Sequence, residues 1–161
     1  MSDVVDTIVD QWRQERPDLD LSAVGVFGRL SRLALLVQPA LEQVFERHGL
    51  RHGEFDVLAA LRRSGPPYRL TPSSLSTMLM LSRAGMTNRL DRLEAAGLVR
   101  RRLDPADRRS FQVELTDRGY QVVDAAMTEH AANEIRLLAG LTDEQRRALD
   151  ESLRVLIRTL S

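Results

Sequence analysis

Two short alternating runs joined by a charged loop constrain the fold of this chain more than any other feature. The runs are LVRRRL (98–103) and FQVEL (111–115), and the loop between them is DPADRRS. Runs of this length predict β-strands, and the proline-containing loop closes them into a hairpin. The rest of the chain has helical periodicity. The sequence therefore predicts a mainly α-helical protein with one small β-hairpin.

Two predicted helices stand directly before this hairpin. Thr71 is a good N-cap and Pro72 a good first helical residue, which predicts a short helix over about 72–79. The second helix covers 83–97 and ends at Gly97. Its apolar positions fall on one narrow face: Met86, Leu90 and Leu93. Two short helices joined by three residues predict a helix-turn-helix, and the hairpin after it is the wing of a winged helix-turn-helix.

Charge is distributed unevenly along the chain. Residues 57–118 carry 12 arginines and 6 acidic residues, whereas residues 1–56 carry 6 and 10, and residues 119–161 carry 5 and 7. The predicted winged helix is therefore basic, although the whole chain has no net charge. A basic surface on this motif predicts contact with nucleic-acid phosphates. The alternative is a chance imbalance on a solvated surface.

The residues expected to contact DNA lie on the second helix, on the first helix of the motif and on the wing. They are Ser73 and Ser74 on backbone phosphates, Arg83, Thr87, Asn88 and Arg92 in the groove, and Arg108 and Arg109 on the wing. The wing arginines are expected to reach a neighbouring minor groove. The alternative for the wing is an ordinary solvated turn held by aspartate–arginine pairs.

Residues 1–50 and 119–161 are predicted to form helices that join two copies of the chain. The first segment contains an added amphipathic helix over 3–15 and a long helix with Pro39 in its interior. The two segments together hold more apolar helix than a winged helix of about 60 residues can cover. We therefore expect a homodimer, with 51–118 as the DNA-binding lobe. Packing within one chain is the alternative.

The composition limits where the chain acts. There is no cysteine, which excludes disulfides, thiolate metal sites and thiol redox sensing. The acidic N-terminal stretch is not typical of a signal or transit peptide. No apolar run approaches the roughly 20 residues that a membrane span needs. We therefore expect a cytoplasmic protein that does not act at a membrane.

An enzyme is the first competing interpretation. No phosphate loop or Ser–His–Asp arrangement is evident, and the histidines are three: His48, His52 and His130. They are expected at the surface or at helix ends, without a metal site or a cofactor. A regulator that senses oxidation could use only methionines, namely Met78, Met80 or Met86. A winged helix that binds other proteins instead of DNA is a further alternative.

These residues resemble the multiple-antibiotic-resistance regulator (MarR) family of bacterial transcription factors. The resemblance covers nearly the whole chain in element order and is sharpest in MTNRLDRLEAAGLVRRRLDPADRRSFQVELTDRG (86–119). The part that matches the family's wing signature is Asp107-Arg108-Arg109, followed by Leu115, Thr116 and Gly119. The resemblance implies a dimer with interlocked terminal helices and a pseudo-palindromic operator. It also implies a ligand that binds between the dimerisation helices and each lobe and relieves repression.

A narrower resemblance connects the chain with the urate-responsive subgroup of this family. The added N-terminal helix with QWRQERPDLD and the segment EFDVLAALRRSGPPYRLTP carry it. The resemblance implies a ligand set of one tryptophan, one aspartate and two arginines: Trp12, Asp56, Arg89 and Arg101. An indole face and guanidinium donors suit a flat anionic purine such as urate. The segment LSRAGMTNR departs from the subgroup's small polar residues, which puts the DNA sequence preference in doubt.

In the mechanism that the subgroup implies, the bound anion repels Asp56, which moves, and its partner Arg101 carries the shift into the DNA-binding lobe. Plainer roles are packing for Trp12, a favourable charge at a helix start for Asp56, and phosphate contacts for Arg89 and Arg101. A carboxylate such as trans-aconitate is the alternative ligand. The operator, the regulated genes and the choice between repressor and activator stay open at this point.

Overall fold

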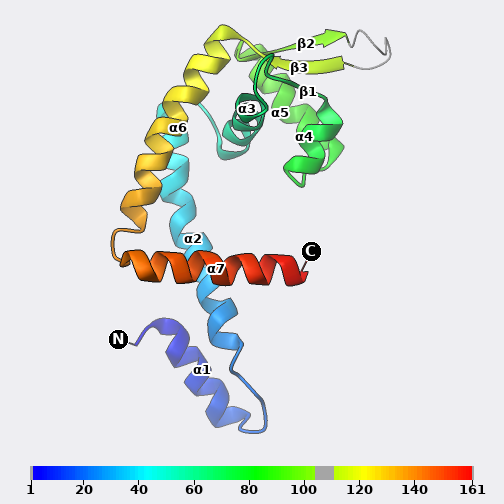
Figure 1. Cartoon of the computed structure of the whole chain (residues 1–161). Helices are drawn as coiled ribbons and strands as arrows, with labels where there is room; N and C mark the ends of the chain where they lie inside the picture. The colour runs from blue at the N-terminus through cyan, green and yellow to red at the C-terminus, as the bar shows by residue number, and fades with distance from the viewer. Residues whose placement is uncertain (1, 104–110, 161) are drawn as a thin grey trace. The chain divides into compact units, whose positions relative to one another are not determined.

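The computed structural model describes residues 2–103 and 111–160 (Figure 1). Its elements within these residues are, in chain order, α1 (Val4–Glu15), α2 (Val24–Arg47), α3 (His52–Arg63), β1 (Arg69–Leu70), α4 (Pro72–Met78), α5 (Arg83–Ala95), β2 (Val99–Leu103), β3 (Phe111–Leu115), α6 (Asp117–Leu137) and α7 (Asp143–Leu160). The chain divides into two compact units, residues 1–40 and residues 41–161. The predicted fold class, mainly helical with a small antiparallel sheet, is confirmed.

The first unit contains α1 and the N-terminal part of α2. The Asp3 side chain caps α1 by accepting backbone N–H bonds in its first turn. Val5 and Val9 are buried, and a Cβ on Gly28 of α2 would lie 3.0 Å from a Val5 methyl group. Arg29 of α2 forms an ion pair with Asp3, at 2.9 Å. The predicted amphipathic helix is therefore present and is held to α2 by apolar packing and charge.

One hydrophobic core fills the second unit. The sheet contacts α3, α4, α5 and α6. The largest side chains that are fully buried include Phe45, Leu58, Leu61, Leu75, Met86, Leu90, Leu93, Val113 and Val123. Burying one such side chain stabilises the fold by about 1.5–3 kcal/mol. The predicted apolar face of α5 is confirmed, since its three positions all lie in this core.

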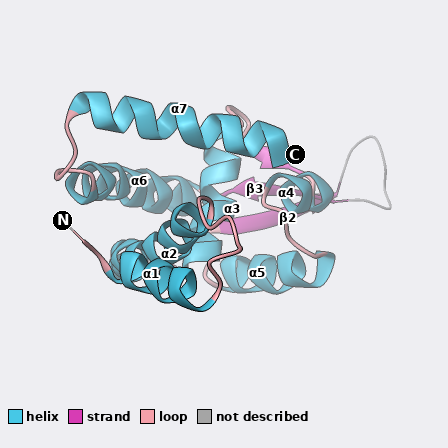
Figure 2. Ribbon diagram, turned by 90° about the horizontal axis from the view of Figure 1, so that it is seen from below, coloured by secondary structure: helices cyan, strands magenta, loops and turns pink. Residues whose placement is uncertain are grey.

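The sheet is antiparallel with the strand order β1-β3-β2. Figure 2 draws its strands in magenta, with β2 and β3 labelled. The predicted hairpin is formed by β2 and β3, whose register pairs Arg100 with Glu114 and Arg101 with Val113. The sequence does not predict β1, because two residues are too few to show an alternating pattern. β1 pairs Arg69 with Glu114. The central strand therefore brings arginines from both neighbouring strands to Glu114.

The helix-turn-helix consists of α4, α5 and the turn between them. The Thr71 hydroxyl accepts the N–H of Ser74 at 3.1 Å, and the Ser82 hydroxyl accepts the N–H of Gly85 at 3.1 Å. Both helices thus begin at a capped residue. Met80 in the turn has a φ of +51°, a conformation that glycine adopts more readily.

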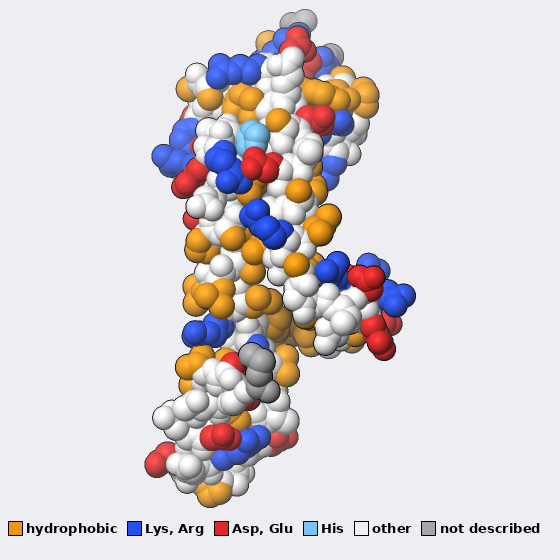
Figure 3. All heavy atoms as spheres, turned by 90° about the vertical axis from the view of Figure 1, so that its left-hand side faces the viewer, with side chains coloured by type: hydrophobic (Ala, Val, Ile, Leu, Met, Phe, Trp, Pro, Cys, Tyr) orange, Lys and Arg blue, Asp and Glu red, His pale blue; other side chains and the backbone are white. Residues whose placement is uncertain are grey.

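Helix α2 is long and apolar enough, by length and composition, to cross a membrane. The expectation that no segment approaches this limit is therefore wrong for α2. Arg29 and Arg32 interrupt the apolar sequence of α2, but its mean hydropathy stays high because most other residues of the helix are apolar. One such helix is weak evidence of a span, because core helices of soluble proteins meet the same criterion. Figure 3 shows exposed hydrophobic side chains in orange on the face that it draws. Several large hydrophobic side chains of α2 are exposed: Phe27, Leu33, Leu35 and Leu36.

Candidate nucleic-acid interface and ligand site

Three residues predicted to contact DNA line one recess between α4, α5 and the start of β3. Ser73 lies in the first turn of α4, and Arg83 and Thr87 lie in the first turns of α5; all three are exposed. The recess has a volume of about 290 Å³, and Met86 and Phe111 add apolar lining. The structure therefore brings hydroxyl donors and a guanidinium together over an apolar floor.

Two further predicted DNA contacts, Ser74 and Asn88, lie on the same two helices, α4 and α5. The Ser74 hydroxyl lies 2.9 Å from the Thr71 hydroxyl and so takes part in the cap of α4. Asn88 is exposed on α5, one residue after Thr87. Arg108 and Arg109 lie in 104–110, outside the residues that the structure describes.

Arg92 is tied to the start of α3. Its Nε donates to the Glu54 carboxylate at 2.6 Å, and the other carboxylate oxygen accepts the N–H of Arg51 at 3.0 Å. Burial alone would raise the pKa of Glu54, but these hydrogen bonds outweigh it, so the pKa is lowered. The Arg92 side chain still exposes 44% of its surface. Arg92 therefore joins α5 to α3 through this ion pair and still exposes part of its side chain to solvent.

The four residues of the expected ligand set lie on four different elements. Trp12 is on α1 in the first unit and is half exposed. The other three lie in the second unit: Asp56 on α3, Arg89 on α5 and Arg101 on β2. Arg89 lies against the first turn of α3, the helix that carries Asp56. Arg101 instead lies beside two carboxylates of α5.

The Arg89 guanidinium lies directly against Gly53. A Cβ built on Gly53 would be 2.3 Å from Nε and 2.6 Å from Cζ of Arg89. Its Nη1 is buried and has no hydrogen-bond partner among the described residues. Gly53 precedes Asp56 by three residues, so the two share a face of α3. The Arg89 guanidinium therefore lies one helical turn from the residue that carries the Asp56 carboxylate, and its Nη1 can still donate a hydrogen bond.

The expected pair of Asp56 and Arg101 is absent among the described residues. Asp56 has His52 as its neighbour, at 3.7 Å. Arg101 donates to Asp91 at 2.5 Å and to Glu94 at 2.6 Å, both on α5. The reason is the register, because Arg101 lies opposite the buried Val113 on the sheet face that meets α5. Arg101 thereby joins the wing to the recognition helix.

Three arginines surround Glu114, and the sequence alone did not predict this cluster. Arg69 comes from β1, and Arg100 and Arg102 come from β2. The carboxylate accepts from Arg100 at 2.9 Å and from Arg69 at 3.2 Å, and pairs with Arg102 at 2.5 Å. The Arg100 hydrogen bond is the largest cause that lowers the pKa of Glu114 to about 2, against the opposing effect of burial. Alternation places 100 and 102 on one face, but only the register identifies Glu114 as their partner.

Two of the three histidines contact one aromatic side chain of the core. His52 and His130 pack against the Phe45 ring, with centroid distances of 5.4 and 5.2 Å. The Nε2 of His48 lies 2.8 Å from a carboxylate oxygen of Glu129. His48 and His52 are at helix ends as expected, whereas His130 is in the interior of α6 with a mostly buried side chain. Within residues 2–103 and 111–160, no group of three or more potential ligands could hold a metal ion.

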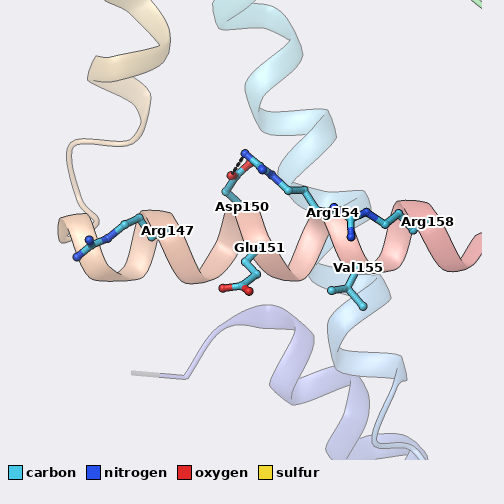
Figure 4. Close-up of a pocket in the computed structure, with 6 residues that line it drawn as sticks. All are labelled: Arg147, Asp150, Glu151, Arg154, Val155 and Arg158. Carbon is cyan, nitrogen blue, oxygen red and sulfur yellow. Dashed lines mark ion pairs between the residues drawn. The ribbon is translucent and has the colours of Figure 1, made fainter.

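A depression on α7 is shown in Figure 4. Its six lining residues all belong to this one helix: Arg147, Asp150, Glu151, Arg154, Val155 and Arg158. Asp150 and Arg154 form an ion pair at 2.6 Å across one helical turn. Such exposed i, i+4 pairs are ordinary on helix surfaces. The depression therefore adds no candidate site.

Known proteins share both the sequence and the fold of this chain. A model of the MarR family matches residues 48–110. The HTH-type transcriptional regulator PecS of Dickeya dadantii is 45% identical over 142 residues, which are 88% of this chain and 86% of that protein. The HTH-type transcriptional repressor YetL of Bacillus subtilis is 26% identical, over 89% and 86% of the two chains.

The fold of this chain is also similar to that of a solved structure of the same family. The MarR family transcriptional regulator Sco3205 of Streptomyces coelicolor, in complex with DNA, superposes with a TM-score of 0.79 and 28% identity. The match covers 89% of this chain and 90% of that one. The winged helix-turn-helix and its flanking helices are thus an arrangement seen on DNA in a similar protein.

Proposed function

The chain belongs to the MarR family of DNA-binding transcriptional regulators, and from this premise we propose that it is a dimeric repressor released from its operator by a small anion, urate or a related purine. The observation that carries the ligand part is the Arg89 guanidinium beside Gly53, with a buried nitrogen that has no hydrogen-bond partner among the described residues. The name of the relative YetL supports the repressing sense of the regulation.

The DNA surface in this proposal consists of α5, the start of α4 and the wing. Its residues are Ser73, Ser74, Arg83, Thr87, Asn88 and Arg92, with Arg108 and Arg109 on the wing. Two lobes in a dimer would read half-sites about one helical turn apart, roughly 10–10.5 bp. Because arginines neutralise phosphates, the affinity should fall steeply with salt. An affinity that does not change with salt would refute this surface.

Exposed apolar side chains on the terminal helices support a homodimer. Large hydrophobic side chains are exposed on α2, α6 and α7 and at the residue after α6: Phe27, Leu33, Leu35, Leu36, Ile135, Leu137, Leu138, Val155, Ile157 and Leu160. Exposed apolar patches of this kind mark interfaces, and a second copy would cover them. In this division, 1–50 and 119–161 form the dimerisation region and 51–118 the DNA-binding lobe.

An anionic ligand suits the surroundings of Arg89. The start of a helix carries partial positive charge, so a guanidinium placed there is unfavourable until an anion accompanies it. Arg89 offers a planar donor fork to the edge of a purine anion. The ligand set that the family resemblance implies also includes Trp12, whose indole offers an aromatic face and an N–H donor. A simple phosphate contact needs neither a planar donor fork nor an aromatic face, so these two features favour a purine as the ligand.

The recognition helix α5 carries both ligand and DNA residues, which gives the ligand a route to the DNA. Arg89 and Arg92 both contact the first turn of α3. An anion held by Arg89 would repel the nearby Asp56 carboxylate and shift the start of α3. Arg101, which is bound to α5, would carry the shift to the wing. A coupling free energy of about 1–3 kcal/mol between the two sites is enough for a useful switch.

The fluorescence of Trp12, the only tryptophan in the chain, tests the ligand. The protein would be titrated with urate, xanthine, trans-aconitate and salicylate, with free tryptophan to correct for ligand absorption and Arg89→Ala as the control variant. We expect saturable quenching by urate that is lost in Arg89→Ala. Quenching by trans-aconitate alone would identify the ligand as a carboxylate and not a purine. No response to any of the four compounds would refute the proposed ligand site.

A further inference from the structure

Gly53 is the second residue of α3, and its backbone does not require glycine. Its φ is not positive, in contrast to Gly49, Gly65 and Gly97. It lies in regular helix, where alanine is the better helix former. A glycine at this place therefore weakens the helix without relieving strain. We therefore ask which atoms occupy the position that a side chain on residue 53 would take.

The Arg89 guanidinium occupies that space. A Cβ on Gly53 would lie 2.3 Å from Nε, 2.6 Å from Cζ and 2.6 Å from Nη2 of Arg89. Real Cβ contacts essentially never fall below 3.0 Å, so something would have to move. The atoms that it meets are the far end of a flexible side chain. A methyl group at residue 53 would therefore displace the guanidinium and leave the backbone in place.

We propose that Gly53 is a positioning residue of the ligand site, because its missing side chain sets the place at which the Arg89 guanidinium meets a bound anion. This inference rests on the proposed function and concerns the same site. The neighbouring carboxylates leave Arg89 available: Glu54 is bound by Arg92, and Asp56 has His52 as its neighbour. The buried Nη1, which has no hydrogen-bond partner within residues 2–103 and 111–160, is the donor that displacement would withdraw.

A purely structural role is the competing explanation, in which Gly53 only lets α3 and α5 approach. The two explanations differ once the guanidinium is removed. A positioning role makes the effect of Gly53→Ala depend on Arg89, and a general packing role does not. A double-mutant cycle measures this dependence.

The experiment compares wild type, Gly53→Ala, Arg89→Ala and the double variant by urate titration and by thermal unfolding. Gly140→Ala is the matched control, since a Cβ there would meet nothing within 4 Å. We expect Gly53→Ala to weaken urate binding by about tenfold or more, as for a lost hydrogen bond to a charged group. In the Arg89→Ala background the same substitution should raise the midpoint of unfolding, because alanine favours the helix and no guanidinium opposes it. Gly140→Ala should leave urate binding at the wild-type level.

The outcomes separate this inference from the proposed function. Wild-type urate affinity in Gly53→Ala would overturn the inference and leave the urate site standing. Shifts of the unfolding midpoint that simply add in the double variant would also overturn it, because Gly53 would then act without Arg89. If the wild-type protein does not bind urate, the proposed ligand fails. A non-additive cycle would then still support the positioning of Arg89 by Gly53.

Discussion

Glu114 accepts the guanidinium groups of Arg69, Arg100 and Arg102, which come from both neighbouring strands of the sheet. The carboxylate exposes only 9% of its side chain, and the arginines satisfy it in place of water. A buried carboxylate without such partners would be costly. At the scale of the residue, the basic sheet is therefore stabilised by a single acidic side chain at its centre.

The pH dependence of stability should reveal this cluster. The lowered pKa of Glu114, about 2 in the folded protein against an ordinary 4.5, means that its contribution is complete above about pH 4.5 and is lost as pH falls towards 2. We expect Glu114→Gln to lower the free energy of unfolding by about 1–3 kcal/mol at pH 7. Chemical denaturation at several pH values measures the difference. A difference as large at pH 2.5 as at pH 7 would contradict it, and the exposed Glu15→Gln should change little at either pH.

Contacts at the residue scale were the least predictable from the sequence. The residue types of the ligand set could be proposed from a resemblance, but the partners of Arg101 depend on the register of β2 against β3. The approach of Arg89 to Gly53 depends on how α3 packs on α5, which no local pattern encodes. Both are long-range arrangements, whereas caps and apolar faces follow from neighbours along the chain.

At the scale of the element, the helix-turn-helix follows closely from local sequence. Thr71 and Ser82 provide the caps, and the spacing of apolar residues in α5 gives its buried face. The hairpin follows from alternation. The strand β1 does not, because its two residues are defined only by their pairing with β3.

The turn between α4 and α5 contains a strained residue that can be relieved. Met80 has a φ of +51° and exposes 93% of its surface, so little packing offsets its conformation. We expect Met80→Gly to raise the free energy of unfolding by about 0.5–1 kcal/mol. Urea denaturation would measure it. Met78→Gly, in the last turn of α4, is the control and should lower stability; a loss of stability in both variants would show that the turn is not strained.

At the scale of the whole molecule, the terminal helices leave more apolar surface than one chain covers. Leu36 on α2 and Ile157 on α7 each expose 64% of their surface. We expect Leu36→Asp and Ile157→Asp to convert a dimer into a monomer of 18.2 kDa. Sedimentation velocity would measure the mass. Met80→Asp changes an even more exposed hydrophobic residue outside these helices and should stay dimeric. A wild-type protein that is already monomeric would contradict the proposal.

In the proposed mechanism, an anion held by Arg89 releases the regulator from DNA. The most direct measurement is an electrophoretic mobility shift with the gene's own promoter at fixed salt, with urate added to wild type and to Arg89→Ala. Each protein would be used at the concentration that gives half-saturation of the DNA. We predict that urate releases the DNA from wild type and not from Arg89→Ala. A wild-type complex that persists in urate, or release of DNA from both proteins at the same urate concentration, would contradict this mechanism.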